Sequence, residues 1–149
     1  MARRVSRKRT VSASREDVWQ LVADPYSLPR WWPRVMRVEG VEGEGQSAQW
    51  TKVLGTSEGR SVRADFHCTA AVEPDRFSWE QDIEGTPFER HLKHYAVEAS
   101  LVEAGSGTEV TLAASQTLRG LSRLGSPMMR RGQGGLLEEA LDALEGALA

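Results

Sequence analysis

The sequence has very little cysteine and no long apolar run. Cys68 is the one cysteine among 149 residues, so it has no partner for an internal disulfide and no spacing typical of a metal site. No apolar stretch approaches the ~20 residues that span a bilayer. The basic segment 3–9 is not followed by the apolar stretch of a secretory signal. We therefore expect a cytoplasmic protein with no integral membrane segment.

Positive charge is also too scarce for a typical nucleic-acid-binding domain. The 19 lysines and arginines are outnumbered by 21 aspartates and glutamates, which leaves a net charge of −2. The resulting pI is about 6.0, whereas basic nucleic-acid-binding domains usually have a pI above about 9. We expect no nucleic-acid partner.

Short catalytic and cofactor-binding motifs are missing as well. No cluster of histidine, cysteine and carboxylate residues has the spacing of a zinc site. The GxSxG elbow of serine hydrolases and the glycine patterns of phosphate and dinucleotide loops are absent. The sequence therefore predicts neither a metal nor a cofactor.

The chain does contain enough apolar and aromatic material for one packed domain. It is 40% hydrophobic and 27% charged, and it has five tryptophans. A chain of this length is expected to form one domain with a sizeable core, and no linker or repeat divides it. We predict a single domain over residues 1–149.

Apolar residues recur with a period of two along most of the chain, which predicts β-strands. Val5–Val11 alternates in this way and is expected to form a strand with its charged residues outward. Each later segment has one apolar and one polar face, as in an antiparallel sheet that is covered on one side and solvated on the other. The later strands are expected at about 35–41, 48–53, 62–70, 77–83, 88–102 and 110–118.

Helical spacing replaces this alternation in two regions. Ser12 or Ser14 is expected to cap a first helix, and Ser14 with Asp17 three residues later resembles a capping box. This helix is expected to end at Asp24-Pro25, and a second short helix is expected at Tyr26–Arg30. Near the C-terminus, apolar residues at spacings of three and four predict a long amphipathic helix, while three glycines predict a kink or break in it. The apolar positions are Leu137, Ala140, Leu141, Leu144 and Leu148, and the glycines are Gly132, Gly134 and Gly135.

The order of these elements predicts an α+β helix-grip fold. A curved antiparallel sheet of about seven strands would wrap around the long C-terminal helix, with two short helices after the first strand. Small residues on the inward faces, Ala64, Ala99 and Ala114, would leave space rather than fill it. They favour a cavity between the sheet and the helix.

Three stretches carry a resemblance to a known superfamily: Ala13–Val38 (ASREDVWQLVADPYSLPRWWPRVMRV), Gly105–Leu112 (GSGTEVTL) and the C-terminal helix. In them the chain resembles the START-like superfamily, within its polyketide cyclase/dehydrase (SRPBCC) branch, which also includes the birch-pollen-allergen fold. The resemblance implies binding of lipids, sterols, hormones or polyketides in the cavity, or cyclisation or dehydration of bound polyketides. It implies no universal catalytic signature.

Side chains on the inward faces of the strands are the candidates for contact with a ligand. Tyr95 and Gln116 are the more informative ones, because a buried polar group needs a partner, which a ligand can provide. Such side chains would serve equally well in a packed core, and Trp31-Trp32 could either stack on a ligand or anchor the short helices. The candidate ligand-binding residues are Trp50, Phe66, Trp79, Tyr95, Leu112, Gln116 and Met128.

His91 and Tyr95 are the candidate catalytic groups, since both would share a strand face near the cavity mouth and could transfer protons. His91 and His94 differ by three residues, so they cannot share a strand face and do not form a metal pair. A basic stretch, Arg119–Arg131, either recognises an anionic partner or is a solvated helix face.

Three functions are open on this basis. The first is burial of a small hydrophobic or amphipathic ligand, lipid-like or polyketide-like, with the C-terminal helix and its glycines as a lid or hinge. The second is a polyketide aromatase/cyclase or dehydratase, which needs a titratable group inside the cavity. The third is a protein-partner module of the stress-response type, which needs an exposed apolar patch and a small or filled cavity. The ligand and the oligomeric state, with a homodimer among the options, stay open.

Overall fold

One antiparallel sheet of seven strands forms the body of the protein, in the order β1-β7-β6-β5-β4-β3-β2. The structure is a computed structural model that describes residues 3–56, 58–120 and 126–149, with side chains except at 126–130. The strands are β1 (Arg3–Val11), β2 (Val35–Glu42), β3 (Gln49–Gly55), β4 (Ser61–Val72), β5 (Arg76–Asp82), β6 (Leu92–Ala104) and β7 (Gly107–Leu118). The helices of the described residues are α1 (Arg15–Val22), α2 (Leu28–Trp31), α3 (Ser126–Leu148) and the short 3-10 helices η1 (Pro25–Ser27), η2 (Gly45–Ser47) and η3 (Pro87–Arg90). The predicted α+β helix-grip fold is confirmed.

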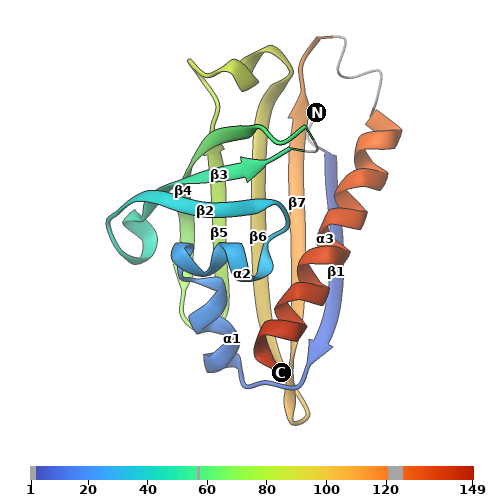
Figure 1. Ribbon diagram of the computed structural model, residues 1–149. Helices are drawn as coiled ribbons and strands as arrows, with labels where there is room; N and C mark the ends of the chain where they lie inside the picture. The colour runs from blue at the N-terminus through green and yellow to red at the C-terminus, as the bar shows by residue number, and fades with distance from the viewer. Residues whose placement is uncertain (1–2, 57, 121–125) are drawn as a thin grey trace.

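Different helices cover different parts of the inner face of the curved sheet. Figure 1 shows α3 running along β1 and β7, and α3 contacts both strands. The first helix, α1, packs on β6, while α2 contacts β2 and α3. The inner face is therefore covered by α3 over β1 and β7 and by α1 and α2 over β6 and β2, and the two groups meet where α2 contacts α3.

Local capping decides where the first helices begin and end. The Ser14 hydroxyl accepts a hydrogen bond from the backbone N–H of Asp17 at 3.1 Å, which satisfies one of the free N–H groups at the start of α1. The carboxylate of Asp24 accepts one from the N–H of Tyr26 at 3.0 Å and caps η1. The predicted short helices after the first strand are thereby confirmed.

The sixth strand and the C-terminal helix differ from the sequence predictions. The sixth strand begins at Leu92 rather than at about Phe88, because Pro87 lacks the N–H that a sheet requires and starts η3 instead. The predicted break in the C-terminal helix is wrong, since α3 continues through residues 132–135. Packing of its apolar face outweighs the helix-propensity cost of about 1 kcal/mol per glycine.

Two charged residues of β1, Arg7 and Arg9, differ from the expectation that they point outward. Arg9 lies on the side of β1 that faces α3, where it donates to Glu138 at 2.9 Å and also pairs with Asp142 and Glu145. Arg7, on the same side, lies 3.6 Å from Glu138. These ion pairs satisfy the inward-facing cations of the edge strand with the acidic side of α3.

Aromatic rings fill the core between the sheet and the helices. All five tryptophans are at most 8% exposed. Trp31, Trp32 and Trp79 meet edge to face, with the Trp31 and Trp32 ring centroids 5.5 Å apart and those of Trp32 and Trp79 5.3 Å apart. On the α3 side, Leu137 and Leu141 are fully buried. No helix of the described residues is long and apolar enough to cross a membrane.

The glycines of α3 give a test of its continuity. A Cβ added at Gly135 meets no atom within 4 Å, so Gly135→Ala is expected to raise the free energy of unfolding by up to about 1 kcal/mol. A Cβ at Gly134 would lie 2.6 Å from the guanidinium of Arg7 and would displace it, so Gly134→Ala should gain less. Urea unfolding of both variants measures the difference, and a loss of stability in Gly135→Ala would contradict an uninterrupted helix.

Candidate functional site

The register of the sheet places polar side chains side by side on its inner face. Phe66 of β4 pairs with Gln81 of β5, and Tyr95 of β6 pairs with Gln116 of β7. Lys52 of β3 belongs to the neighbouring inward pair between β3 and β4. Because alternate residues of a strand share one face, these polar groups point towards the helices rather than to solvent.

One step further along the strands, the same inner face is apolar. Trp79 pairs with Val97, which pairs with Ala114, and all three side chains are buried. These residues continue the aromatic core. The polar row therefore marks the boundary at which the packed core ends.

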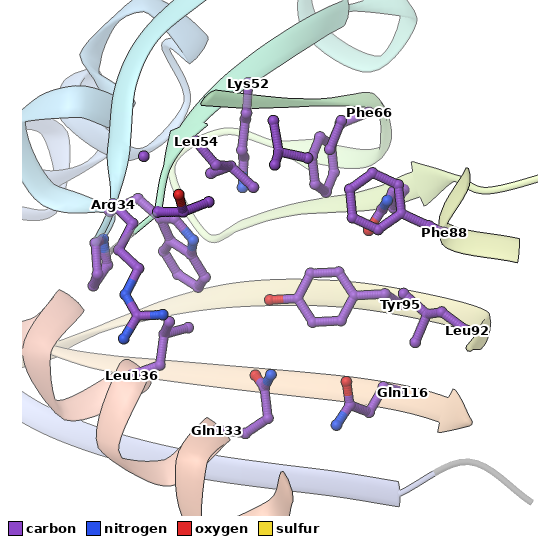
Figure 2. Close-up of a pocket in the computed structure, with 17 residues that line it drawn as sticks. Arg34, Lys52, Leu54, Phe66, Phe88, Leu92, Tyr95, Gln116, Gln133 and Leu136 are labelled. Atoms are coloured by element: carbon purple, nitrogen blue, oxygen red, sulfur yellow. The ribbon is translucent and has the colours of Figure 1, made fainter. Parts of the chain in front are cut away.

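A cavity of about 360 Å³ lies beyond this boundary. Its volume falls at the lower end of the range of about 300–1,000 Å³ that is typical of small-molecule sites. Figure 2 shows side chains from the strands and from α3 converging on it. The main apolar lining residues are Trp32, Leu54, Ala64, Phe66, Phe88 and Leu136.

Lys52 is buried at the wall of this cavity and is only 1% exposed. Its Nζ atom lies 4.2 Å from the ring centroid of Phe66, 4.7 Å from that of Trp79 and 4.9 Å from that of Trp32. Within the described part of the chain, Lys52 has neither a carboxylate nor a hydrogen-bond partner. The amine is therefore held by aromatic faces alone.

Burial lowers the pKa of the Lys52 ammonium well below its ordinary value, because the charged form loses its hydration. The aromatic faces act in the opposite direction, since a ring face attracts a cation. Desolvation is the stronger effect for an unpaired buried ion, whose burial costs several kcal/mol. The neutral amine is consequently far more populated at Lys52 than at a surface lysine.

Other polar groups of the cavity offer hydrogen bonds. The Tyr95 hydroxyl points into the hollow (Figure 2), and burial raises the pKa of this phenol, so it stays protonated and can donate. The ring of Tyr95 is only half-buried because it borders the hollow itself. Among the described residues, Nε2 of Gln81 has no acceptor and Oε1 of Gln133 has no donor. A bound molecule could satisfy both.

The charge around the cavity has one sign. Its described lining residues include the basic side chains of Lys52 and Arg34 but no carboxylate. Arg34 is exposed at the mouth and has a positive φ of 65°, a backbone conformation uncommon for residues other than glycine. The arrangement suits a ligand with an apolar body and an electron-rich oxygen group.

Three of the predicted ligand-binding residues, Phe66, Tyr95 and Gln116, line the cavity. Met128 lies outside the described side chains. His91 and the remaining candidates are placed elsewhere by the structure.

Trp50, Trp79 and Leu112 occupy the core instead, each at most 2% exposed. They face inward as expected, but packing against neighbouring side chains keeps them out of the cavity lining. Trp79 still reaches Lys52 through its ring face. The sequence could not separate these residues from the lining ones, because both groups share the same strand faces.

The expectation that His91 and Tyr95 share a face is wrong. His91 is exposed after η3 and is not part of the cavity lining. An irregularity at the start of β6, between Leu92 and His94, shifts the alternation, so that Leu92 lines the cavity with Tyr95. Of the basic stretch, Arg119 and Arg131 are exposed, Arg123 lies outside the described residues, and recognition of an anion stays a prediction.

Lys52, Gln81 and Arg34 were not among the predicted site residues. Lys52 follows Trp50 by two residues and Gln81 follows Trp79 by two, so the period-two pattern already placed both on inward faces. A lysine on an inward strand face, such as Lys52, was the sequence signal that could have identified this site residue. Nothing in the sequence pattern marks Arg34, whose place depends on the turn between α2 and β2.

The curved sheet, the long helix and the cavity between them define a START-like helix-grip domain. The chain belongs to the family described as polyketide cyclase / dehydrase and lipid transport, whose model matches residues 2–149. A comparison with curated proteins by sequence found no match.

Solved structures share this fold at low sequence identity. The di-domain ARO/CYC BexL of the BE-7585A biosynthetic pathway matches with a TM-score of 0.80 and 11% identity, over 99% of this chain and 50% of BexL. A START superfamily protein from Mycobacterium smegmatis matches with a TM-score of 0.78 and 20% identity, over 97% and 96% of the two chains. Ara h 8.0201 matches with a TM-score of 0.70 and 15% identity, over 99% and 98%. The chain thus spans about half the length of the di-domain protein.

Replacement of Lys52 by methionine tests the burial of the amine. The pKa of Lys52 is lowered in the native protein and has its ordinary value of about 10.4 in the unfolded chain. Between those two values the unfolded state binds more protons, so the stability of the wild-type protein rises with pH. We expect Lys52→Met to raise the free energy of unfolding by about 1–3 kcal/mol at neutral pH, the typical cost of an unpaired buried polar group.

The same variant should flatten the rise of stability with pH, since the titrating group is gone. Denaturant unfolding at several values between about pH 7 and about pH 10 measures both effects. Lys93→Met, at an exposed position of β6, is the matched control and should keep the wild-type slope. Equal slopes in Lys52→Met and the wild type would show that the amine is hydrated in the native protein.

Proposed function

We propose that the protein binds a small amphipathic molecule, lipid-like or polyketide-like, in the cavity between the sheet and α3. The observation that supports this function is a hollow of about 360 Å³ with apolar walls and a few convergent polar groups. Burial of apolar ligand surface would supply affinity at roughly 25 cal/mol per Å² before ordering costs. Lys52, Gln81 and Tyr95 would orient the oxygen-bearing end of the ligand.

The polar groups of the lining further restrict the class of head group that the ligand can carry. The amine of Lys52, the guanidinium of Arg34 and the phenol of Tyr95 can all donate hydrogen bonds, and the described lining has no carboxylate to compete with the ligand. A positively charged head group would meet repulsion from Arg34 at the mouth. We therefore propose ligands whose head group is neutral or anionic and carries acceptor oxygens.

A polyketide cyclase or dehydratase is the second candidate. The observation in its favour is that Lys52 and Tyr95, two titratable groups with perturbed pKa values, share one cavity, as acid–base chemistry requires. The partner-module alternative needs a small or filled cavity and an exposed apolar patch, and a hollow with room for a small ligand favours the binding function over it. We also propose a cytoplasmic location, where a free buried thiol such as Cys68 persists.

Ala64→Leu tests the cavity as the binding site. Ala64 is 3% exposed and lines the hollow, so the added side chain would occupy ligand space. We expect displacement of anilinonaphthalene sulfonate by octanol or octanoate to weaken at least about tenfold, a loss of about 1.4 kcal/mol. Ala104→Leu, at the β6–β7 hairpin, makes the same change away from the cavity and should leave binding intact. Unchanged affinity in Ala64→Leu, with a folded protein, would contradict the proposed site.

Tyr95→Phe tests the polar end of the site. Loss of the hydroxyl removes one hydrogen bond worth about 0.5–1.5 kcal/mol, so octanol should bind roughly three- to tenfold more weakly. His91→Ala is the control, because His91 lies outside the cavity lining, and it should bind octanol as the wild type does. A larger effect for His91→Ala than for Tyr95→Phe would move the ligand towards η3 and out of the cavity.

A further inference from the structure

Lys52 is the group of the cavity that simple ligand burial does not explain. A lysine on an inward strand face is unfavourable for folding, and burial of an unpaired polar group costs about 1–3 kcal/mol. The chain has three lysines, and the other two, Lys8 and Lys93, are exposed. An apolar residue at position 52 would enclose an apolar ligand equally well.

The surroundings of Lys52 leave its nitrogen without a partner. Nζ is enclosed by the ring faces of Trp32, Phe66 and Trp79, and no acceptor for its protons exists among the described residues. Lys52 lines the cavity, and Figure 2 shows its amine pointing into the same hollow as the Tyr95 hydroxyl. An amine in this position faces whatever molecule fills the hollow.

Among the described residues, no titratable or charged group of the cavity stabilises the ammonium form of Lys52. The lining elements contribute the guanidinium of Arg34 and the phenol of Tyr95, and the described lining contains no carboxylate that would hold the ammonium. A lysine that is desolvated in an apolar pocket is a recognised form of activated nucleophile. An unprotonated lysine reacts with the carbonyl carbon of an aldehyde or ketone but not with a carboxylate. Its reactivity therefore distinguishes these two classes of ligand.

We propose that the amine of Lys52 forms a reversible imine with the aldehyde or ketone carbonyl of an apolar ligand bound in the cavity. The proposal rests on the proposed ligand-binding function and adds to it the class of head group and a covalent step. It predicts that the site retains aldehydes and ketones in preference to alcohols and carboxylic acids of the same size.

The step balances without any oxidant, reductant or co-reactant. The nitrogen lone pair forms a bond to the carbonyl carbon while the π electrons move to oxygen, and one amine proton transfers to that oxygen to give a carbinolamine. The C–O bond then breaks, the second amine proton leaves with the oxygen, and the products are the imine and one water molecule. Tyr95, aimed into the same hollow, is the side chain that can relay these protons.

Reductive trapping of the 149-residue chain tests the proposal. Octanal and sodium cyanoborohydride convert an imine into a stable secondary amine, which intact mass and peptide mapping locate. Each unit by which a lysine pKa is lowered gives about tenfold more neutral amine at a pH below both values. We expect Lys52 to be alkylated at least about tenfold faster than Lys8 or Lys93 near neutral pH, and excess octanol to suppress labelling at Lys52 alone.

Two variants keep the result interpretable. Lys52→Arg retains a basic side chain but cannot form the imine, so the cavity-protected label should disappear, whereas Lys93→Arg should keep it. Circular dichroism confirms that both variants are folded, and wild-type protein with octanol gives the binding reference without covalent chemistry.

The outcomes separate this proposal from the proposed function. If octanol displaces anilinonaphthalene sulfonate but octanal labels Lys8, Lys93 and the N-terminus in preference to Lys52, the imine is refuted and ligand binding stands. If neither octanol nor octanal displaces the dye, the proposed function itself is refuted, together with the proposal that depends on it. Rapid, octanol-sensitive labelling of Lys52 supports both.

Discussion

The apolar inner face of the curved seven-stranded sheet has to be shielded from water. The rest of the structure depends on which parts of this face the helices cover and which part they leave open. Leu137 and Leu141 of α3 close one side of that face, and tryptophans beneath α1 and α2 close another. Beyond the row that contains Gln81 and Tyr95, side chains of the strands and of α3 border a hollow of about 360 Å³ instead of packing against one another. The cavity thus lies where the helical cover of the sheet is incomplete.

Burial of Lys52 at the wall of this hollow lowers the stability of the fold. Core packing alone favours an apolar residue on the inward face of β3, and the aromatic faces around the nitrogen offset only part of the lost hydration. Departures from the local rules of stability are commonly found where a protein binds or reacts. The orphaned Nε2 of Gln81 is a second departure at the same wall. Both are intelligible if the cavity is completed by a ligand rather than by protein.

Similarity to known structures concerns the fold of this chain rather than the side chains of its cavity. Proteins that share 11–20% of their residues with this chain keep the same fold, with TM-scores from 0.70 to 0.80. Such identities leave the cavity side chains free to differ, and function resides in those side chains rather than in the fold. The family to which the chain belongs covers both polyketide chemistry and lipid transport. Lys52, Tyr95 and Arg34 are therefore the residues on which a choice between the two depends.

The sequence by itself determined the order of the elements, the inward faces of most strands and the cap of the first helix, because these follow from local periodicity and from Ser14. It did not reveal that α3 runs unbroken through its glycines, since long-range packing overrides helix propensity. Nor did it separate lining from core: Trp50 and Phe66 sit opposite each other on paired strands, yet only Phe66 borders the hollow. Which inward side chain meets another and which meets empty space depends on the three-dimensional placement of helices far away in the chain, and that placement is decided only by the tertiary fold.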